Sequence, residues 1–498
     1  MNMDIKKIDS LPAVIIMVTV LSVIKAFFGI IALGFNGDFF WCLQVLNRMD
    51  HGQMIYRDIF LGVTPLSMYV LRALAASGPG AESICIVLVN MLSQIGTVVL
   101  CLLLARYFKF KHLFLLAAAI VYLTDVWLCP PYTPLAMMFL VFICLYMIQQ
   151  LQDAPADNRR QCVRLFLLGS LTGLCFCSKQ NIGMYVFAAV LTCYFYFHRE
   201  ETVASRSYRM IPVVLGFAAI SSLFLAPIFF TGALKGFLDY CFIGKSNYLF
   251  SGISYVHSLF LCKSPHYLVI LCLPMVCFST SLWWWKVRPP DRNKIVTLFW
   301  FAVAATANAF PRGDIWHLNC AVPLLVTVFI LSVSGILPAV NLVRLNVPVA
   351  ILLIALSVFP QREGLYSFIR AETTVSKARY IKWLVVKKEM TGELERLRAE
   401  IPGGDRERTL FLFTNAAKAY LATDVMNPTP YDYPLSSAFG RTGEAEIMKR
   451  IKKGDIRYVI LEDCDVPLRL TPWSLHNFVT RTMKQVSKHG RYRLFALK

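Results

Sequence analysis

Charged side chains interrupt an otherwise apolar sequence in a few short stretches, and their types suit chemistry on a phosphate ester. Arg57, Lys179 and Arg312 are basic residues that suit a phosphate or pyrophosphate group. Asp38 and Asp125 are carboxylates, and a carboxylate suits the role of a general base that acts on a hydroxyl. Because acidic and basic groups occur together, these stretches predict a site if the fold brings them to one face.

The stretch that starts at Asp38 has the pattern of a helix. Apolar residues recur after it at helical spacing, namely Phe39, Leu43, Leu46 and Met49. The pattern predicts an amphipathic helix that lies in the membrane interface. Asp38 then lies close to the membrane surface or caps the N-terminus of the helix, and the two roles are compatible. Farther along, Tyr56 and Asp58 flank Arg57 and are supporting candidates.

Asp125 and Lys179 each lie at the end of an apolar segment. Asp125 is near the outer end of the third segment, where it is either a functional group or an interfacial carboxylate hydrated from outside. Lys179 and Gln180 lie in a tight polar connection between two apolar segments. A structural turn explains the neighbouring Asn181 and Gly183, but it does not explain a lysine on a side that is poor in positive charge.

The last polar stretch contains Arg312, Asp314 and His317. If a helix starts near Asp314, then Asp314 and His317 share one face of it at a spacing of three residues. The alternative is a capping aspartate followed by an interfacial histidine.

The apolar segments define the class of protein. The chain has 498 residues, of which 57% are hydrophobic and 16% are charged, whereas soluble proteins carry about 25% charged residues. A spanning helix needs roughly 20 mostly apolar residues, so we predict a polytopic α-helical membrane protein with about eleven transmembrane helices. The predicted segments are residues 11–35, 83–106, 112–129, 134–150, 163–178, 181–198, 210–231, 265–285, 295–310, 317–337 and 347–359.

Two lysines lie within or between these segments. We expect two spans on either side of Lys179 rather than one interrupted element, because the polar residues 178–181 would be costly in lipid. Lys25 lies inside the first span, where a lysine extends toward the interface, finds a partner in a neighbouring helix or has a function.

The distribution of Lys and Arg predicts the orientation. The loops on the side of the N-terminus are short and rich in Lys and Arg, so the N-terminus is expected in the cytoplasm. With eleven spans, the tail from about residue 360 is extracytoplasmic, and the protein lies in the inner (plasma) membrane. All four polar stretches then face the extracytoplasmic side. The net charge of +20 follows from membrane-flanking residues and a basic tail, so it does not indicate nucleic acid as a partner.

Hydropathy divides the chain into two predicted domains. Residues 1–359 form the transmembrane domain, with a first outer loop at 36–82, and residues 360–498 form a small extracytoplasmic α/β domain. In the tail we predict a charged helix over residues 372–400 and another at 443–453. We also predict three strands, at residues 409–414, 458–461 and 491–495.

Cysteine usage indicates neither a metal site nor a disulfide framework. Most of the 15 cysteines lie in apolar segments, where cysteine behaves as a small buried hydrophobe. Cys175 and Cys177 have no matching pair elsewhere, which argues against zinc. Cys241 and Cys262 fall in one outer loop and could form a bridge, although spacing alone does not fix the geometry.

The order of these motifs resembles that of the GT-C glycosyltransferases, specifically bacterial relatives of protein O-mannosyltransferases and of the aminoarabinose transferases that modify lipid A. The resemblance covers most of the chain. The matching residues are Gly37-Asp38, residues 56–60, Pro65-Leu66, Gly173-Leu174, residues 179–183, Pro311-Arg312 through His317, and residues 427–431 in the tail.

The resemblance implies an inverting transfer of a sugar from a polyprenyl phosphate. Asp38 would deprotonate an acceptor hydroxyl, and Asp125 corresponds to a second acidic residue that some members carry. Arg57, Lys179, Arg312 and His317 would stabilise the leaving phosphate, with Tyr56, Asp58, Gln180 and Asp314 in support. Several relatives have an acidic pair where this chain has Asp38 alone, so no residue is assigned to a metal. No cofactor is certain, and participation of a divalent cation is left open.

The partners implied are a polyprenyl-phosphate-linked sugar, a glycolipid, glycan or protein acceptor, and membrane lipids. Two alternatives remain: a flippase or transporter of lipid-linked sugars, and a polysaccharide polymerase or ligase. A transporter concentrates polar residues near the middle of the bilayer, often in repeated halves, whereas here they gather at one predicted surface, which favours the enzyme.

Overall fold

The computed structural model divides the chain into two compact units. The helical unit comprises Met1–Gly29, Val89–Phe224 and Ile253–Glu363, and the mixed unit comprises Ile30–Leu88, Leu225–Gly252 and Gly364–Lys498. The structure describes residues 10–33, 37–76, 78, 80–124, 130–150, 158–245, 255–262, 264–288, 291–309, 315–336, 346–358, 373–375, 380, 385–413, 416–435, 438–463 and 471–498.

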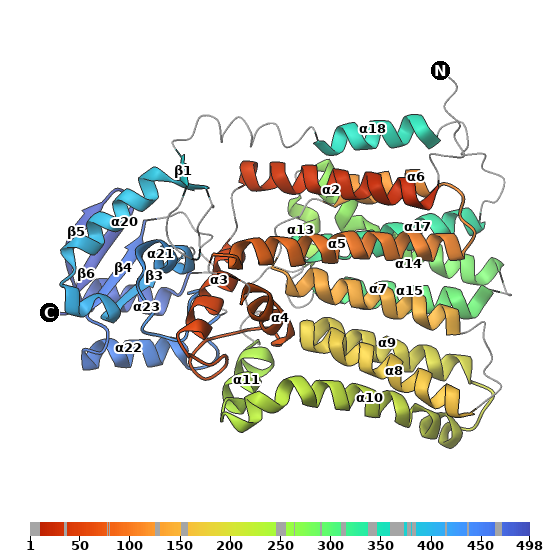
Figure 1. The fold of residues 1–498 in the computed structure, drawn as a ribbon, viewed down its shortest axis with the longest axis horizontal. Coiled ribbons are helices and arrows are strands. Elements are labelled where there is room, and N and C mark those ends of the chain that lie inside the picture. The colour runs from red at the N-terminus through yellow and green to blue at the C-terminus, as the bar shows by residue number, and fades with distance from the viewer. Residues whose placement is uncertain are drawn as a thin grey trace. The chain divides into compact units, whose positions relative to one another are not determined.

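Long apolar helices build the helical unit, and some of them continue into the mixed unit (Figure 1). A helix lies in each of the eleven predicted apolar segments. The helices are α2 (Leu11–Leu33), α5 (Glu82–Tyr107), α6 (Leu113–Leu123), α7 (Tyr132–Gln150), α8 (Asn158–Ser178), α9 (Gln180–Phe197), α10 (Val203–Phe230), α14 (Pro265–Val287), α15 (Arg292–Thr306), α17 (Val322–Ile336) and α18 (Asn346–Val358).

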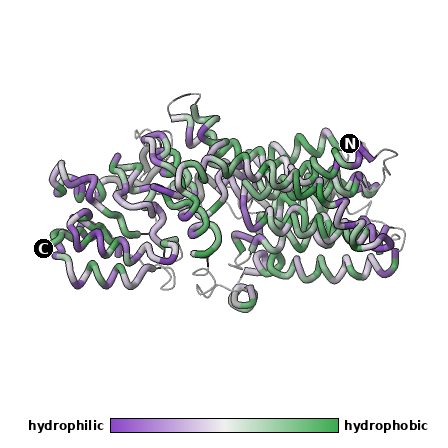
Figure 2. Tube along the Cα trace, turned by 90° about the horizontal axis from the view of Figure 1, so that it is seen from below, coloured by the Kyte–Doolittle hydropathy of each residue, from purple (hydrophilic) through white to green (hydrophobic). Residues whose placement is uncertain are grey.

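Five helices of the described part, α5, α7, α8, α10 and α14, are long and apolar enough to cross a membrane. Hydrophobic residues occupy the middle of the helices and hydrophilic residues gather at their ends (Figure 2). Large apolar side chains on α10 are exposed, among them Leu223 and Phe230, which suits contact with lipid rather than water. The chain is therefore a multi-pass membrane protein, and the number of spans stays a prediction.

The helices pack closely where small residues allow it. Gly183 on α9 lies against α8, and a Cβ at this position would lie 2.1 Å from the Cα of Phe176. Only glycine permits this approach. The two helices meet at Lys179, which has an extended backbone, so the predicted break into two helices is confirmed.

Lys25 on α2 is buried and finds partners in a neighbouring helix. Its Nζ donates a hydrogen bond to the carbonyl oxygen of Thr124 at 3.0 Å and another to that of Val121. Both carbonyls lie at the C-terminal end of α6, where the last carbonyl groups lack partners within the helix and favour a cation. Of the predicted roles for Lys25, the contact with a neighbouring helix is the one observed.

A four-stranded sheet forms the centre of the tail. Its order is β3 (Thr409–Leu412), β4 (Tyr458–Glu462), β6 (Tyr492–Ala496) and β5 (Lys484–His489), with β3 parallel to β4 and the other neighbours antiparallel. Four helices accompany the sheet, namely α20 (Lys388–Glu400), α21 (Ala416–Thr423), α22 (Gly443–Lys453) and α23 (Trp473–Thr482). Phe411, Tyr420 and Tyr492 lie in the core of this part.

The predicted strands β3, β4 and β6 and the helix α22 are confirmed. The predicted helix over residues 372–400 is wrong in its first half. There β1 (Thr373–Val375) and β2 (Val385–Lys387) pair as an antiparallel sheet, and the helix α20 begins only at Lys388. Thr373, Thr374 and Val375 are β-branched residues, which favour a strand. The edge strand β5 is charged and largely exposed, so hydropathy does not reveal it.

The mixed unit also contains the first outer loop and a segment after α10. These parts contribute α3 (Gly37–Asp50), α4 (Leu66–Ala75), α11 (Leu234–Cys241) and the single turn η1 (Ile243–Lys245). The contacts thus group the tail with the first outer loop, which the sequence analysis placed in the transmembrane domain. The predicted boundary at residue 359 stays a prediction.

Candidate functional site

Asp38 lies in the first turn of α3, so the predicted helix is confirmed. A carboxylate there is stabilised by the helix macrodipole. Burial, and then the negative charge of Asp38, raise the pKa of the Cys42 thiol one turn further on. Asp38 itself is partly exposed.

The amphipathic surface predicted for α3 is wrong, whereas its position in the membrane interface stays a prediction. Residues 39–49 are all buried, including the polar residues Gln44, Asn47 and Arg48. The tail covers the helix: Trp41 stacks on Tyr433 with ring centroids 6.2 Å apart. Of these polar side chains, Arg48 bonds with the tail, and Asn47 donates to the Gln44 side-chain oxygen at 3.2 Å within α3.

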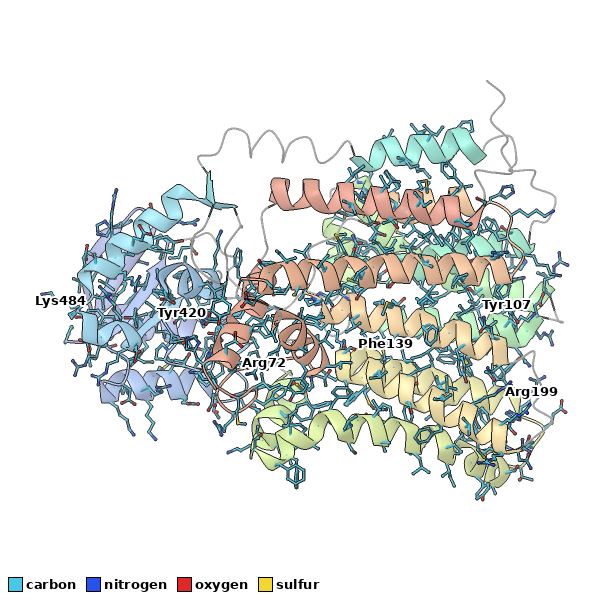
Figure 3. The ribbon with its side chains drawn as sticks, viewed as in Figure 1. Arg72, Tyr107, Phe139, Arg199, Tyr420 and Lys484 are labelled. Atoms are coloured by element: carbon cyan, nitrogen blue, oxygen red, sulfur yellow. The ribbon has the colours of Figure 1, made fainter. Side chains whose placement is uncertain are left out.

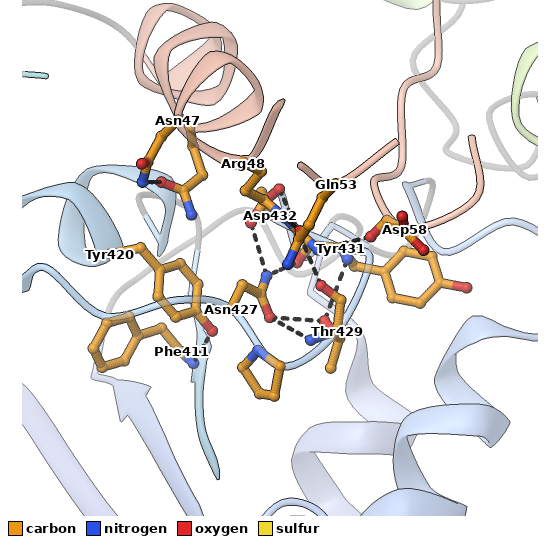
Figure 4. Close-up of polar contacts among 12 residues, drawn as sticks. Asn47, Arg48, Gln53, Asp58, Phe411, Tyr420, Asn427, Thr429, Tyr431 and Asp432 are labelled. Carbon is orange, nitrogen blue, oxygen red and sulfur yellow. Dashed lines mark hydrogen bonds and ion pairs between the residues drawn. The ribbon is translucent and has the colours of Figure 1, made fainter. Parts of the chain in front are cut away.

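Arg48 is the centre of the contact between α3 and the tail (Figure 4). Its guanidinium donates to the Asp432 carboxylate at 2.9 Å, to the Thr429 carbonyl at 2.8 Å, to the Asp58 carbonyl at 2.7 Å and to the Gln53 side chain at 2.6 Å. Arg48 and Asp432 are buried, and we call these residues the Arg48 network. Burial raises the pKa of the Asp432 carboxyl, and the adjacent Arg48 opposes this rise.

The tail motif at residues 427–431 shapes the turn that presents Asp432. The Asn427 side chain accepts hydrogen bonds from the backbone N–H of Thr429 at 2.8 Å and from its hydroxyl at 2.9 Å. The same side chain donates to the Tyr431 carbonyl and to Asp432, each at 2.9 Å. The motif thus positions the Asp432 carboxylate for Arg48.

Tyr56 is a structural residue of the first outer loop. Its φ of 67° lies in the left-handed region, which is strained for a side chain of this size. The buried hydroxyl donates to the Val63 carbonyl at 2.5 Å, and the ring packs edge-on against Phe237. A Cβ at Gly236 would lie 1.8 Å from the Tyr56 carbonyl oxygen, so only glycine fits there. Tyr56 therefore fixes the backbone next to Arg57.

Arg57 is exposed and forms an ion pair with Asp58, with 2.8 Å between Nη2 and Oδ2. The hydrogen bond from Arg57 lowers the pKa of the Asp58 carboxyl, which also accepts from the Met54 backbone N–H at 2.9 Å. Because half of the Arg57 side chain stays in solvent, its guanidinium can also reach an anion outside the loop.

Lys179 lies in the helical unit and is buried, with 7% of the residue exposed. Its Nζ donates to the Thr133 hydroxyl at 2.9 Å and to the Asn308 side-chain oxygen at 2.8 Å. The ring of Tyr132 lies beside the ammonium, 5.6 Å from Nζ to its centroid. Both oxygens are neutral, and they orient the ammonium. Lys179, Tyr132, Thr133 and Asn308 are called the Lys179 network.

The polar residues of the next segments connect to this network. Asn308 lies in the turn η3 (Ala307–Ala309) and donates from Nδ2 to the carbonyl oxygen of His317 at 2.6 Å. His317 lies in the short helix α16 (Ile315–Asn319). Gln180 is buried at the first position of α9, next to Lys179. The structure thus brings Lys179, Gln180 and the His317 backbone into one region of the helical unit.

The remaining candidates lie elsewhere in the chain. Asp38, Tyr56, Arg57 and Asp58 lie in the mixed unit. Asp125, Arg312 and Asp314 lie outside the described residues, so the predicted shared face of Asp314 and His317 is not tested. Cys241 and Cys262 are both free thiols, so the bridge between them is absent. Among the described residues, no group of three His, Cys, Asp or Glu side chains could hold a metal ion.

Sequence reasoning did not identify Thr133, Asn308, Arg48 and Asp432. Thr133 follows residues 130–132, which resemble a turn, and nothing in the sequence links it to Lys179. Arg48 and Asp432 are 384 residues apart. The one feature of the sequence that pointed to this pair was the tail motif at residues 427–431, which ends directly before Asp432.

Comparisons with known proteins identify the fold. No protein-family model matches the sequence, and no curated protein sequence does. Among solved structures, ArnT from Cupriavidus metallidurans bound to undecaprenyl phosphate is similar over 97% of each chain, with a TM-score of 0.54 and 12% identity. An oligosaccharyltransferase from Archaeoglobus fulgidus, in complex with zinc and sulfate, is similar over 90% of this chain and 68% of its own, with the same TM-score and identity. Both are GT-C glycosyltransferases, so the chain has the GT-C fold.

Proposed function

We propose that the chain is a membrane glycosyltransferase that moves a sugar from a polyprenyl phosphate to a hydroxyl of a lipid, glycan or protein. One observation carries the proposal: a buried lysine, oriented by the Thr133 hydroxyl and the Asn308 side-chain oxygen, lies at a helix junction in a fold shared with ArnT bound to undecaprenyl phosphate. An ammonium in a water-poor environment interacts strongly with a phosphate, because little solvent screens the two charges.

Asp38 is the proposed base of the transfer, and Asp125 a second acidic group. The carboxylate of Asp38 accepts the proton of the acceptor hydroxyl. The oxygen then attacks the anomeric carbon opposite the phosphate, the bond from that carbon to the phosphate oxygen breaks, and its electron pair leaves with the lipid phosphate. The configuration at the anomeric carbon is thereby inverted.

Lys179 stabilises the charge that develops on the leaving phosphate. Arg57, Arg312 and His317 are proposed to contribute to the same role. Tyr56 and Asp58 hold Arg57, and Gln180 and Asp314 are supporting residues. Asn308 orients Lys179 and holds the backbone of His317.

The reaction is proposed to occur on the extracytoplasmic face of the inner membrane, with the N-terminus in the cytoplasm. This orientation follows from the Lys and Arg content of the loops. It places the tail and the first outer loop, which form one unit, on the side where an acceptor is found.

The test is a transfer assay with full-length protein and a radiolabelled polyprenyl-phosphate sugar. The wild-type protein should release the lipid phosphate in the presence of an envelope acceptor extract. Asp38→Asn should lower the rate by at least about a hundredfold, because a positioned base contributes about 10²–10⁴ to a rate. Asp455→Asn, an exposed acid on the tail, is the matched control and should retain full activity.

Two outcomes contradict the proposal. Near-normal transfer by Asp38→Asn would exclude Asp38 as the base. Movement of the labelled lipid across vesicles that contain the protein, without cleavage of the sugar–phosphate bond, would identify a flippase instead.

A further inference from the structure

A pocket of about 430 Å³ lies in the mixed unit between the end of α3, the end of α4 and the first turn of α5. Its volume is in the range of small-molecule sites, about 300–1,000 Å³. None of the candidate residues for sugar transfer lines it. The charged residues of its described lining are Asp50, Arg72 and Glu82, and small residues (Ala75, Ala76 and Gly78) leave the space between them open.

Glu82 is the residue that points to a ligand. Only 2% of it is exposed, and its Oε2 has no hydrogen-bond partner among the described residues. A buried carboxylate oxygen without a partner costs free energy, so such groups are normally paired. A ligand in the pocket that donates a hydrogen bond and carries positive charge would supply the missing partner.

Asp50 adds a second carboxylate to the pocket, and Arg72 adds a guanidinium. Asp50 Oδ2 accepts a hydrogen bond from the Tyr380 hydroxyl at 3.0 Å, and Oδ1 lies 3.8 Å from Nε of Arg72. Arg72, labelled in Figure 3, has half of its side chain exposed. The pocket therefore offers two carboxylates to a cation and an accessible guanidinium to an anion.

The position of Glu82 along the chain indicates which class of ligand reaches the pocket. Glu82 is the first residue of α5, a helix long and apolar enough to cross a membrane. The end of such a helix lies at the depth of the lipid headgroups. Ile84 and Leu88 on α5 and Leu74 on α4 are apolar and about half exposed, as expected of residues that face lipid tails next to the pocket.

We propose that this pocket binds the headgroup of a lipid that carries a primary ammonium next to a phosphate, as in phosphatidylethanolamine. The ammonium donates to Glu82 and Asp50, and the phosphate accepts from Arg72. A trimethylated ammonium has no N–H to donate to Glu82, so the site discriminates against choline headgroups. The binding of this lipid does not depend on the proposed glycosyl transfer.

The alternative is that Glu82 only stabilises the N-terminus of α5, since acidic residues favour the first turn of a helix. The two roles differ in their dependence on lipid. A glutamate that only interacts with the helix dipole affects stability equally in every lipid, whereas a ligand-binding glutamate confers a preference for one headgroup.

The experiment measures lipid binding to the delipidated full-length protein in detergent by native mass spectrometry. Phosphatidylethanolamine, phosphatidylcholine and phosphatidylglycerol with identical acyl chains are compared. The wild-type protein should bind the ethanolamine lipid about tenfold more tightly than the choline lipid, the effect of one charged hydrogen bond. Glu82→Gln should abolish this preference, and the exposed-site control Asp455→Asn should keep it.

Arg72→Gln serves as a second variant, because its half-exposed side chain should tolerate the change. It should weaken the binding of the ethanolamine and glycerol lipids alike, since both carry the phosphate. Equal binding of ethanolamine and choline lipids by the wild-type protein would overturn the proposal, as would an unchanged preference in a folded Glu82→Gln variant. If soluble phosphoethanolamine binds as tightly as the lipid, the pocket recognises the ammonium and phosphate groups, but the proposal that its ligand is a lipid is overturned.

Discussion

Two buried cations of this protein make different hydrogen bonds with the described residues. Arg48 in the mixed unit contacts a carboxylate, two carbonyls and an amide oxygen, and its charge is cancelled by Asp432. Lys179 in the helical unit is bonded by a hydroxyl and an amide oxygen, neither of which is charged. The comparison separates a cation that a carboxylate of the fold neutralises from a cation that two neutral oxygens orient, and the proposed function gives the second cation an anionic ligand.

The largest effect on stability is expected at the Arg48 network. Arg48→Met removes one partner of a buried ion pair and leaves the Asp432 carboxylate uncompensated, which costs about 3–5 kcal/mol. Thermal unfolding of the detergent-solubilised protein should therefore shift to a clearly lower temperature.

The double variant Arg48→Met/Asp432→Leu is the control for this prediction. Replacing a whole buried pair by apolar residues is often neutral or stabilising, so most of the lost stability should return. If Arg48→Met unfolds at the wild-type temperature, Arg48 has no structural role.

A single substitution should add a carboxylate to the hydrogen-bond partners of Lys179. Asn308→Asp places a carboxylate 2.8 Å from the Lys179 ammonium, because the two side chains have nearly the same shape. Cancelling the charge should lower kcat/KM for sugar transfer by about ten- to a hundredfold, the range of one charged hydrogen bond, with no loss of stability.

Asn308→Ala separates the charge effect from the loss of the amide. It removes the oxygen that orients Lys179 and the donor to the His317 carbonyl but adds no charge. Its kcat/KM should lie between those of the wild type and Asn308→Asp. Transfer by Asn308→Asp at the wild-type rate would contradict the role of the Lys179 charge.

The smallest effect is expected at Arg57, an exposed cation that already has a carboxylate partner. The hydrogen bond from Arg57 lowers the pKa of the Asp58 carboxyl from its ordinary value of 3.8. The ion pair is thus fully formed above that ordinary value, and its contribution is lost as the pH falls through the lowered pKa.

Asp58→Asn frees Arg57 and should lower KM for the donor by less than about fivefold, as for an exposed pair. Because Asp58 stays ionised from pH 5.5 to 8, the ratio of wild-type to variant KM should be constant over this range. A ratio that changes between these two pH values would show that another group controls Arg57.

Local patterns of the sequence predicted much of this fold. Hydropathy predicted the eleven helical segments, helical spacing predicted α3, and polar residues at 178–181 predicted the junction of α8 and α9. These features depend on neighbours along the chain. The helix predicted at residue 372 was wrong because pairing between β1 and β2 stabilised strands there.

Features that depend on distant residues could not be predicted. The tail motif lies next to Asp432, but nothing in the sequence pairs Asp432 with Arg48. Nor does the sequence pair Thr133 and Asn308 with Lys179, because tertiary packing brings these residues together. For the same reason, α3 was predicted as an amphipathic helix, although residues 39–49 are all buried. Lys179 was identified from its unusual position, but these two partners of it were not.

The most direct test of the charge assigned to Lys179 is a binding titration of the full-length protein with a polyprenyl monophosphate. Lys179→Met should raise Kd by about a hundredfold, as expected for the loss of a charged contact with little solvent screening. The Arg48→Met/Asp432→Leu variant should keep the wild-type Kd, and the uncharged polyprenol should bind all variants equally. An unchanged Kd in a folded Lys179→Met variant would show that the Lys179 ammonium does not bind the phosphate.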